Sequence, residues 1–156
     1  GNFGLGGEPV CEAVGVKGLE RFKPFADLFR EAERRLDKPA KAIGIHSPGH
    51  IADTDEEAYE QLLPHYLEVM TRVGRQRGWR PPSADHLRHE IAGGAWHVGS
   101  PETVARKIAE SVRTLGAVRF DLKYGLAGVP HDAVMRNIEL YGTTVAPMVR
   151  ELLGEH

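Results

Sequence analysis

Charged side chains alternate with apolar ones along residues 118–124, and they are the most direct candidates for contact with a ligand. In a strand, Arg119, Asp121 and Lys123 share one face, while Val118, Phe120 and Leu122 share the other. Lys123 stands near the carboxyl end of this strand, where its ammonium could hold an anionic group of a cofactor or substrate. The alternative is that the three charged residues form a ladder that is mutually paired or solvated.

His46 and Ser47 end a second expected strand, 41–47, which the pair Pro48-Gly49 should break. They have the same position relative to their strand as Lys123 has to its own. Both are therefore candidates to line a pocket, the alternative for the histidine being a hydrogen-bonded structural role.

Ser100 followed by Pro101 is typical of a helix start, with the serine as N-cap. A capped N-terminus can also bind a phosphate through its free N–H groups. No base stands beside Ser100 in the sequence, so a helix cap explains it better than a nucleophile does. Catalytic residues stay unassigned.

No metal site is predicted. His86, His89 and Glu90 are close in sequence, but their order is neither His-Glu-x-x-His nor its inverse, and a third ligand is lacking. His50 is interpreted as a loop residue, Cys11 as inert, and the two tryptophans, Trp79 and Trp96, as covers at the core edges.

Helices and strands alternate along the chain. Helices are expected at 19–36, from a capping box at Thr54 and Glu57 to about Gly78, from Ser83 to Ile91, from Ser100 to Gly116, and from about His131 onward. Pro64 should kink or divide the second of these helices, and Gly142 should interrupt the last. Strands are expected at 41–47 and 118–124, with a third at 95–98 and a fourth near Phe3 to Leu5.

This alternation predicts an α/β fold with parallel strands. A complete eight-stranded β/α barrel needs roughly 200 residues or more, and this chain has 156. We therefore expect a partial (β/α)8 TIM-type barrel, about the C-terminal half, with helices on one face. Residues 1–16 would be a glycine-rich N-terminal segment and 17–156 the half-barrel. The chain starts with Gly1 instead of methionine, so we expect a piece of a longer protein.

Composition narrows the classes of partner. A net charge of −2 argues against nucleic acid and anionic membranes as partners. Cys11 is the single cysteine, which excludes an intrachain disulfide and fits a reducing, cytoplasmic compartment. No apolar run approaches the length of a membrane span, and nothing resembles a signal peptide.

Four phrases, in order, resemble the C-terminal part of the luciferase-like flavin-dependent monooxygenases. They are Ile45-His46-Ser47-Pro48-Gly49 through Ala58, the run Val-Gly-Ser-Pro-Glu-Thr-Val-Ala at 98–105, Phe120-Asp121-Leu122-Lys123-Tyr124, and the closing stretch 138–147. The resemblance implies a β/α barrel that uses reduced FMN, or the deazaflavin F420, to oxidise a small organic substrate. In such proteins the contacts to the isoalloxazine ring and substrate come largely from the N-terminal half, so this chain alone would lack a complete active site.

The resemblance also implies a phosphate role for Gly6 and Gly7. They lie in a turn similar to one that approaches the flavin phosphate in the family, and successive glycines let backbone N–H groups come close to an anion. Two features depart from the family: Glu8 would repel a phosphate, and the sequence shows no pattern for the strand expected between this turn and Leu19. A plain terminal segment is the alternative.

The candidate cofactor contacts are therefore Gly6, Gly7, Ser47, Ser100 and Lys123. Three readings stay open. The chain is a portion of a flavin-dependent oxidoreductase, an inactive half-barrel, or a binding module for a small ligand that keeps a phosphate site. Because an opened barrel leaves unpaired strand edges, the second reading predicts self-association into a homo-oligomer such as a homodimer.

Overall fold

The computed structural model describes residues 11–14, 19–126 and 128–154. The strands are β1 (Cys11–Val14), β2 (Ile43–Ile51), β3 (His97–Gly99) and β4 (Arg119–Lys123). The helices are α1 (Leu19–Arg35), α2 (Asp55–Arg77), α3 (Ala84–Ala92), α4 (Pro101–Leu115), α5 (His131–Leu140), the π-helix η1 (Tyr141–Val145) and α6 (Ala146–Leu153). The alternation of helix and strand is as predicted.

Two strands were at issue near the N-terminus, one between the glycine turn and Leu19 and one near Phe3 to Leu5. The strand that seemed to be missing before Leu19 is present, because β1 occupies Cys11–Val14. Its four residues are too few to produce a recognisable hydrophobic period, which is why the pattern did not reveal it. The strand expected near Phe3 to Leu5, and the glycine turn with it, lie outside the described residues.

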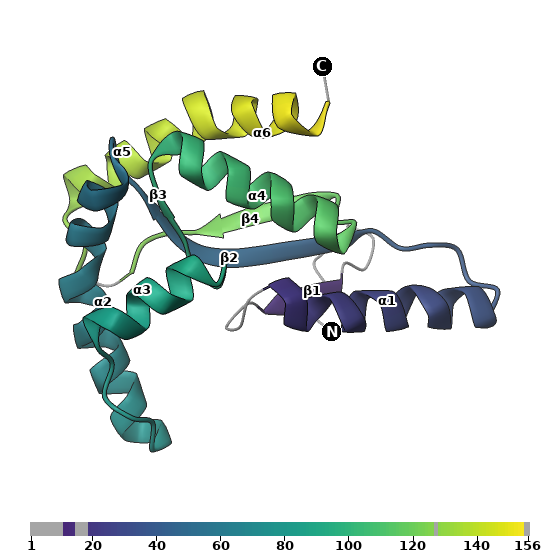
Figure 1. The fold of residues 1–156 in the computed structure, drawn as a ribbon, viewed down its shortest axis with the longest axis horizontal. Coiled ribbons are helices and arrows are strands. Elements are labelled where there is room, and N and C mark those ends of the chain that lie inside the picture. The colour runs from purple at the N-terminus through teal and green to yellow at the C-terminus, as the bar shows by residue number, and fades with distance from the viewer. Residues whose placement is uncertain (1–10, 15–18, 127, 155–156) are drawn as a thin grey trace.

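All strand pairs are parallel, and β2 is the central strand. Residues 44–46 of β2 pair with both β1 and β4, so these two strands must lie on opposite edges of β2. Gly49–Ile51, at the carboxyl end of β2, pair with β3. In Figure 1, α1, α4 and α6 run opposite to β2 and β4, which is the arrangement of repeated β/α units.

Helices cover one face of this sheet. Ile43 and Ile45 of β2 pack against Phe22, Ala26 and Phe29 of α1. A second cluster joins Ile51 and Leu122 to helix α4 and the C-terminal helices; its other buried members are Val104, Ala105, Ile108, Leu140 and Val145. The charged face of β4 is exposed, as the alternation of its residues predicts.

Helices α2 and α3 lie beyond the carboxyl ends of the strands (Figure 1). They have a core of their own, in which Leu62, Tyr66 and Leu87 are almost fully buried with Trp96. The two helices therefore form a wall at the strand ends. No helix among the described residues is long and apolar enough to cross a bilayer.

Pro48-Gly49 does not break the second strand, contrary to the prediction. Strand β2 continues to Ile51 because its pairing partner changes at this point: Pro48 is the last residue paired with β4, and Gly49 is the first paired with β3. A proline lacks a backbone donor, and a change of partner is a position where one donor can be absent.

Three further expectations are corrected or refined. Pro64 does not divide α2, which is a continuous helix. Gly142 interrupts the last α-helix, as predicted, because it lies in η1, where Thr143 Oγ1 donates a hydrogen bond of 2.7 Å to the carbonyl oxygen of Glu139. Val118 is 74% exposed and precedes β4, so the buried apolar face of that strand is formed by Phe120 and Leu122.

Candidate functional site

A cleft of about 820 Å³ opens between the carboxyl ends of β2 and β4 and the wall formed by α2 and α3. The strands contribute His46, Pro48, Gly49 and Lys123, and the loop after β4 contributes Tyr124, Gly125 and Leu126. The helical side contributes Tyr66, Met70, Val73, Arg77, Trp79, Arg80, Pro82, His86 and Glu90, and Trp96 precedes β3. The carboxyl edge of parallel strands is where β/α barrels form their ligand sites.

Aromatic rings make up much of the cleft wall. The rings of Tyr66 and Trp96 meet edge to face with centroids 5.4 Å apart. The Tyr66 hydroxyl donates to Glu90 Oε2 at 3.1 Å. Burial and the neighbouring Glu90 charge raise the pKa of Tyr66, so its hydroxyl stays protonated and remains a donor. This hydrogen bond joins α2 to α3.

The structure brings His46 and Lys123 to the same cleft. Arg119 and Asp121 pair with each other at 3.0 Å between Arg119 Nε and Asp121 Oδ2, so the expected ladder is formed by two of its three members. Within the described part of the chain, no carboxylate forms a salt bridge with Lys123. Its ammonium is therefore available to an anion in the cleft.

Ser47 lies next to His46 but faces helix α4, because successive side chains of a strand point to opposite faces. Its hydroxyl oxygen is 2.8 Å from His97 Nδ1 and 3.1 Å from the carbonyl oxygen of Ala95. The other ring nitrogen of His97 lies 3.2 Å from Ser111 Oγ. Ser47, His97 and Ser111 are all buried. This chain of hydrogen bonds joins β2 and β3 to α4.

The number of protons in this chain of bonds has a consequence for His97. Ser111 Oγ also lies 2.8 Å from the carbonyl oxygen of Lys107. If both serines donate to carbonyls, both ring nitrogens of His97 must donate, and only an imidazolium can do so. Burial and the nearby Lys107 ammonium instead lower the pKa of His97 to about 4, so the ring is neutral near pH 7. One serine must then donate to the ring.

Ser100 is the N-cap of α4, as predicted, and Gly116 is the left-handed C-cap at its other end. Two backbone N–H groups at this helix start are already engaged: Ser100 N donates to Asp55 Oδ1 at 2.7 Å, and Thr103 N donates to Ser100 Oγ at 3.4 Å. Thr103 Oγ1 also donates to Asp55 Oδ2 at 3.1 Å. Partial burial raises the pKa of Asp55. The hydrogen bonds from Ser100 and Thr103 outweigh burial, so the pKa of Asp55 is lowered overall. A carboxylate of this chain thus occupies the anion position at the start of α4.

Replacing Asp55 with alanine is expected to lower the free energy of unfolding by about 1–2 kcal/mol, because the N-terminus of α4 loses its acceptor. The thermal midpoint should fall by roughly 3–6 °C, measured by circular dichroism. Glu56→Ala, the neighbouring exposed residue in the same first turn of α2, is the matched control. Equal losses in the two variants would contradict the role given to Asp55.

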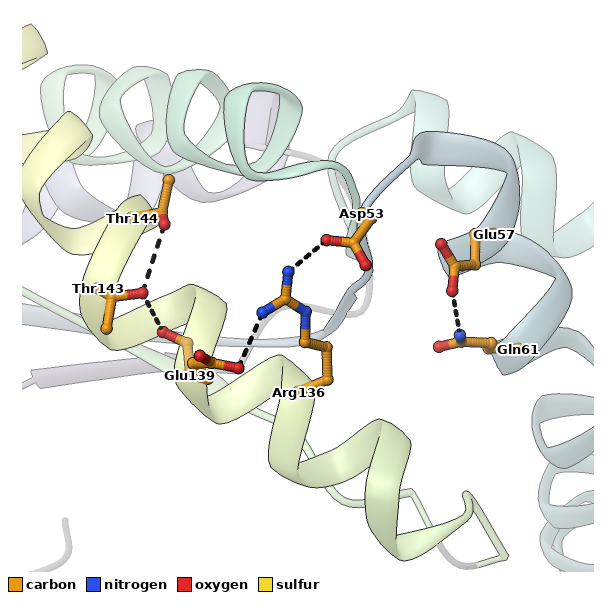
Figure 2. Close-up of polar contacts among 7 residues, drawn as sticks. All are labelled: Asp53, Glu57, Gln61, Arg136, Glu139, Thr143 and Thr144. Atoms are coloured by element: carbon orange, nitrogen blue, oxygen red, sulfur yellow. Dashed lines mark hydrogen bonds and ion pairs between the residues drawn. The ribbon is translucent and has the colours of Figure 1, made fainter.

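Sequence reasoning missed the polar contacts around the loop after β2 (Figure 2). Arg136 of α5 reaches Asp53 with 2.6 Å between Nη2 and Oδ1, and its other nitrogen contacts Glu139 at 2.8 Å. Asn137, fully buried, accepts a hydrogen bond of 2.7 Å from the Ile51 backbone N–H. These contacts tie the carboxyl end of β2 to α5. The bonds of Arg136 to Asp53 and of Asn137 to Ile51 have no signal in the sequence, since their partners are 83 and 86 residues apart.

The sequence suggested that His50 is a loop residue, but the structure places it in β2 as a buried residue. Its Nε2 lies 2.8 Å from Gln61 Oε1, and Gln61 Nε2 donates to Glu57 Oε1 at 2.9 Å (Figure 2 shows the second contact). Burial lowers the pKa of His50, and the bond to Gln61 opposes that shift in part. The row of bonds joins β2 to the first turns of α2.

The remaining candidates are placed as follows. His86 Nε2 lies 3.5 Å from Glu90 Oε1, and the described residues contain no group of three or more His, Cys, Asp or Glu arranged to hold a metal. Trp96 is buried in the core, whereas Trp79 is 51% exposed and stacks with Arg77, whose guanidinium carbon lies 5.1 Å from the ring centroid. Gly6 and Gly7 are outside the described residues.

Comparison with known proteins decides the family. The sequence profile of the luciferase-like monooxygenases matches residues 11–119, which is more than half of the chain. The chain belongs to the luciferase-like monooxygenase family. No curated protein matches it significantly.

Solved structures of luciferase-like and related monooxygenases share the fold. The oxygenating constituent of 3,6-diketocamphane monooxygenase from Pseudomonas putida, solved with FMN, has a TM-score of 0.63 at 20% identity, over 90% of this chain and 42% of its own. Monooxygenase RslO1 from Streptomyces bottropensis has a TM-score of 0.69 at 16% identity, over 88% and 40%. EDTA monooxygenase from Chelativorans sp. BNC1 has a TM-score of 0.57 at 14% identity, over 94% and 46%.

This luciferase-like chain therefore spans less than half the length of each of these three structures. Its parallel α/β architecture corresponds to part of the TIM-type barrel, as the sequence predicted. The cleft lies at the edge of the sheet where such a barrel has its mouth.

Proposed function

We propose that this chain is the C-terminal portion of a flavin-dependent luciferase-like monooxygenase that acts on a small organic substrate in the cytoplasm. The observation that carries the proposal is the cleft at the carboxyl ends of β2 and β4. The family match supports it, as does the FMN bound to the diketocamphane monooxygenase. FMN is the proposed cofactor, with F420 as the alternative.

Lys123 is the cofactor contact that best fits the cleft. It is exposed, lines the cleft and forms no salt bridge among the described residues. Ser47 and Ser100 have their polar groups engaged within the chain, so we assign them structural roles. A phosphate role for Gly6 and Gly7 stays a prediction.

When bound, a reduced flavin would carry out the chemistry with molecular oxygen. The protein would position the flavin and exclude water from it. Lys123 would hold an anionic group at the strand ends. The rings of Tyr66 and Trp96 would form an apolar wall that excludes water from one side. None of the residues that line the cleft is assigned as a catalytic acid or base.

The experiment is a titration of the chain with FMN, followed by flavin fluorescence. We expect saturable binding that Lys123→Met weakens about tenfold, because a charge-assisted contact contributes about 1.5 kcal/mol or more. Lys38→Met, an exposed lysine just after α1, is the control and should bind FMN as the parent does. Saturable binding that Lys123→Met leaves unchanged would contradict the role of Lys123.

An inactive half-barrel that self-associates is the second candidate function. Large apolar side chains exposed on the chain favour it: Phe25, Leu28, Leu36 and Val118 are each at least 66% exposed. Such surfaces commonly mark protein interfaces. A chain that takes up no FMN and elutes as a dimer from a size-exclusion column would favour this candidate over the first. A monomer that binds FMN would exclude it.

A further inference from the structure

We propose that the cleft wall at the end of α2, formed by Arg77, Trp79 and Arg80, binds the anionic group of an aromatic organic acid. The inference deepens the proposed function and rests on it in treating the bound acid as a substrate. It assigns a substrate class to the side of the cleft opposite Lys123 and the strand ends. The binding itself requires no flavin.

The local fold places the three side chains together on the cleft. Arg77 is the last residue of α2, and Gly78 follows in the left-handed conformation with φ 67°. This cap turns the chain back, so that Trp79 N donates to the carbonyl oxygen of Gly74 at 3.0 Å. Arg77, Trp79 and Arg80 consequently line the cleft from one short turn.

The charge of this wall is positive and unneutralised by the described chain. Neither Arg77 nor Arg80 forms a salt bridge with any described carboxylate. Among the described residues that line the cleft, Glu90 is the single carboxylate, and it already accepts the Tyr66 hydroxyl and lies beside His86. The helix C-terminus adds a partial negative charge of roughly 0.5, which two full guanidinium charges outweigh.

The apolar surface of the cleft favours a flat ligand. Trp79 is 51% exposed on this side of the cleft, and Tyr124, which is 43% exposed, lines the side of the strand ends. Met70, Val73 and Pro82 continue the apolar surface. Arg77 stacks on Trp79, which holds its guanidinium beside the ring. An aromatic carboxylate would cover the rings and pair with the arginines together, whereas inorganic phosphate would use the arginines alone.

The two tryptophans of the chain give a direct readout, because both line the cleft. The probe is 2-naphthoate, with 2-naphthamide as its neutral isostere, and the measurement is the shift of the two indole N–H resonances in ¹H–¹⁵N spectra. Trp79→Phe assigns the resonances. We expect naphthoate to shift the Trp79 resonance saturably and to bind at least fivefold more tightly than naphthamide.

The double variant Arg77→Gln/Arg80→Gln should weaken naphthoate at least fivefold and leave naphthamide unchanged. Arg75→Gln is the matched control, since Arg75 is in the same last turn of α2 but does not line the cleft. Equal affinities for the acid and the amide would overturn the proposal. An equal loss in Arg75→Gln, or an unshifted Trp79 resonance, would do the same.

FMN distinguishes this proposal from the one it rests on. If naphthoate and FMN bind together, with Lys123→Met weakening only FMN, both proposals are supported. If FMN displaces naphthoate and the arginine variant weakens FMN equally, the wall holds the flavin phosphate, and the substrate assignment fails. If naphthoate binds while FMN does not, the anion site stands and the flavin proposal loses its support.

Discussion

Gly49→Ala is expected to destabilise the chain by about 3 kcal/mol or more. A Cβ at this position would lie 2.3 Å from the carbonyl oxygen of His97 and 2.5 Å from Leu122 Cδ1. The first contact is with backbone and cannot be relieved by a rotamer change, so β2 and β3 would have to separate. The thermal midpoint should drop by roughly 6–12 °C.

Gly142→Ala is the control for this prediction. Apart from its chain neighbours and the backbone of its own helix, nothing in the described chain lies within 4 Å of the position that its Cβ would take, and the residue is within a helical segment. We expect a change of less than about 1 kcal/mol, in the stabilising direction, because alanine favours helix more than glycine does. Thermal unfolding followed by circular dichroism compares the two. A thermal midpoint for Gly49→Ala within 2 °C of the parent would correspond to a loss of roughly 1 kcal/mol or less in the free energy of unfolding. That result would refute the close contact.

Stability is expected to fall as the pH drops from about 6.5 to about 4, and His97 should account for up to about 3 kcal/mol of the loss. The folded chain keeps His97 neutral through this window, whereas the unfolded chain takes up a proton below pH 6.5. The unfolded state then binds more protons, so the free energy of unfolding rises with pH between these two values. Above pH 6.5 the contribution is constant.

Urea unfolding at several pH values between 7 and 4 tests this dependence. His97→Gln should reduce the slope, leaving the smaller dependence of the same sign that buried His50 contributes. His89→Gln, an exposed histidine of α3, should keep the parent slope. If His97→Gln does not fold, the ring resonances of His97 in the parent still decide: they should not titrate between pH 7 and pH 5.

Local rules predicted several elements of this fold correctly. Thr54, Ser83 and Ser100 each accept a backbone N–H as an N-cap, and Gly78 and Gly116 end their helices in the left-handed conformation. These features depend on hydrogen bonds between residues three or four apart, so the sequence contains all of their partners. The alternation along β4 is also a local property, because successive side chains of a strand point to opposite faces.

Misread elements depended on partners distant in sequence. Pro48-Gly49 looked like a strand break because the change of partner from β4 to β3 is invisible along the chain. Strand β1 was missed because its pairing with β2, not a pattern of its own, defines it. Val118 completed an alternating pattern, but its side chain is exposed to solvent in the structure.

The residues of the candidate site show the same difference between local features and partners that are distant in sequence. The sequence identified His46 and Lys123 as residues at strand ends, and the structure places both on the cleft. It also identified Ser47 and Ser100, whose polar groups are engaged by His97 and Asp55 from 50 and 45 residues away. Arg77 and Arg80 had no sequence signal, because an arginine after a helix is ordinary until the opposite wall of a cleft is known.

The sequence by itself determined the family, the parallel α/β class, and the start and end of most helices, since those depend on short motifs and local hydrogen bonds. Only the tertiary structure decided which polar groups are free to meet a ligand. A serine at a strand or helix end is equally available in sequence whether or not a distant side chain occupies it. Burial and long-range hydrogen bonds satisfied Ser47 and Ser100 within the fold, and they left the cations of the cleft without a partner in the described chain.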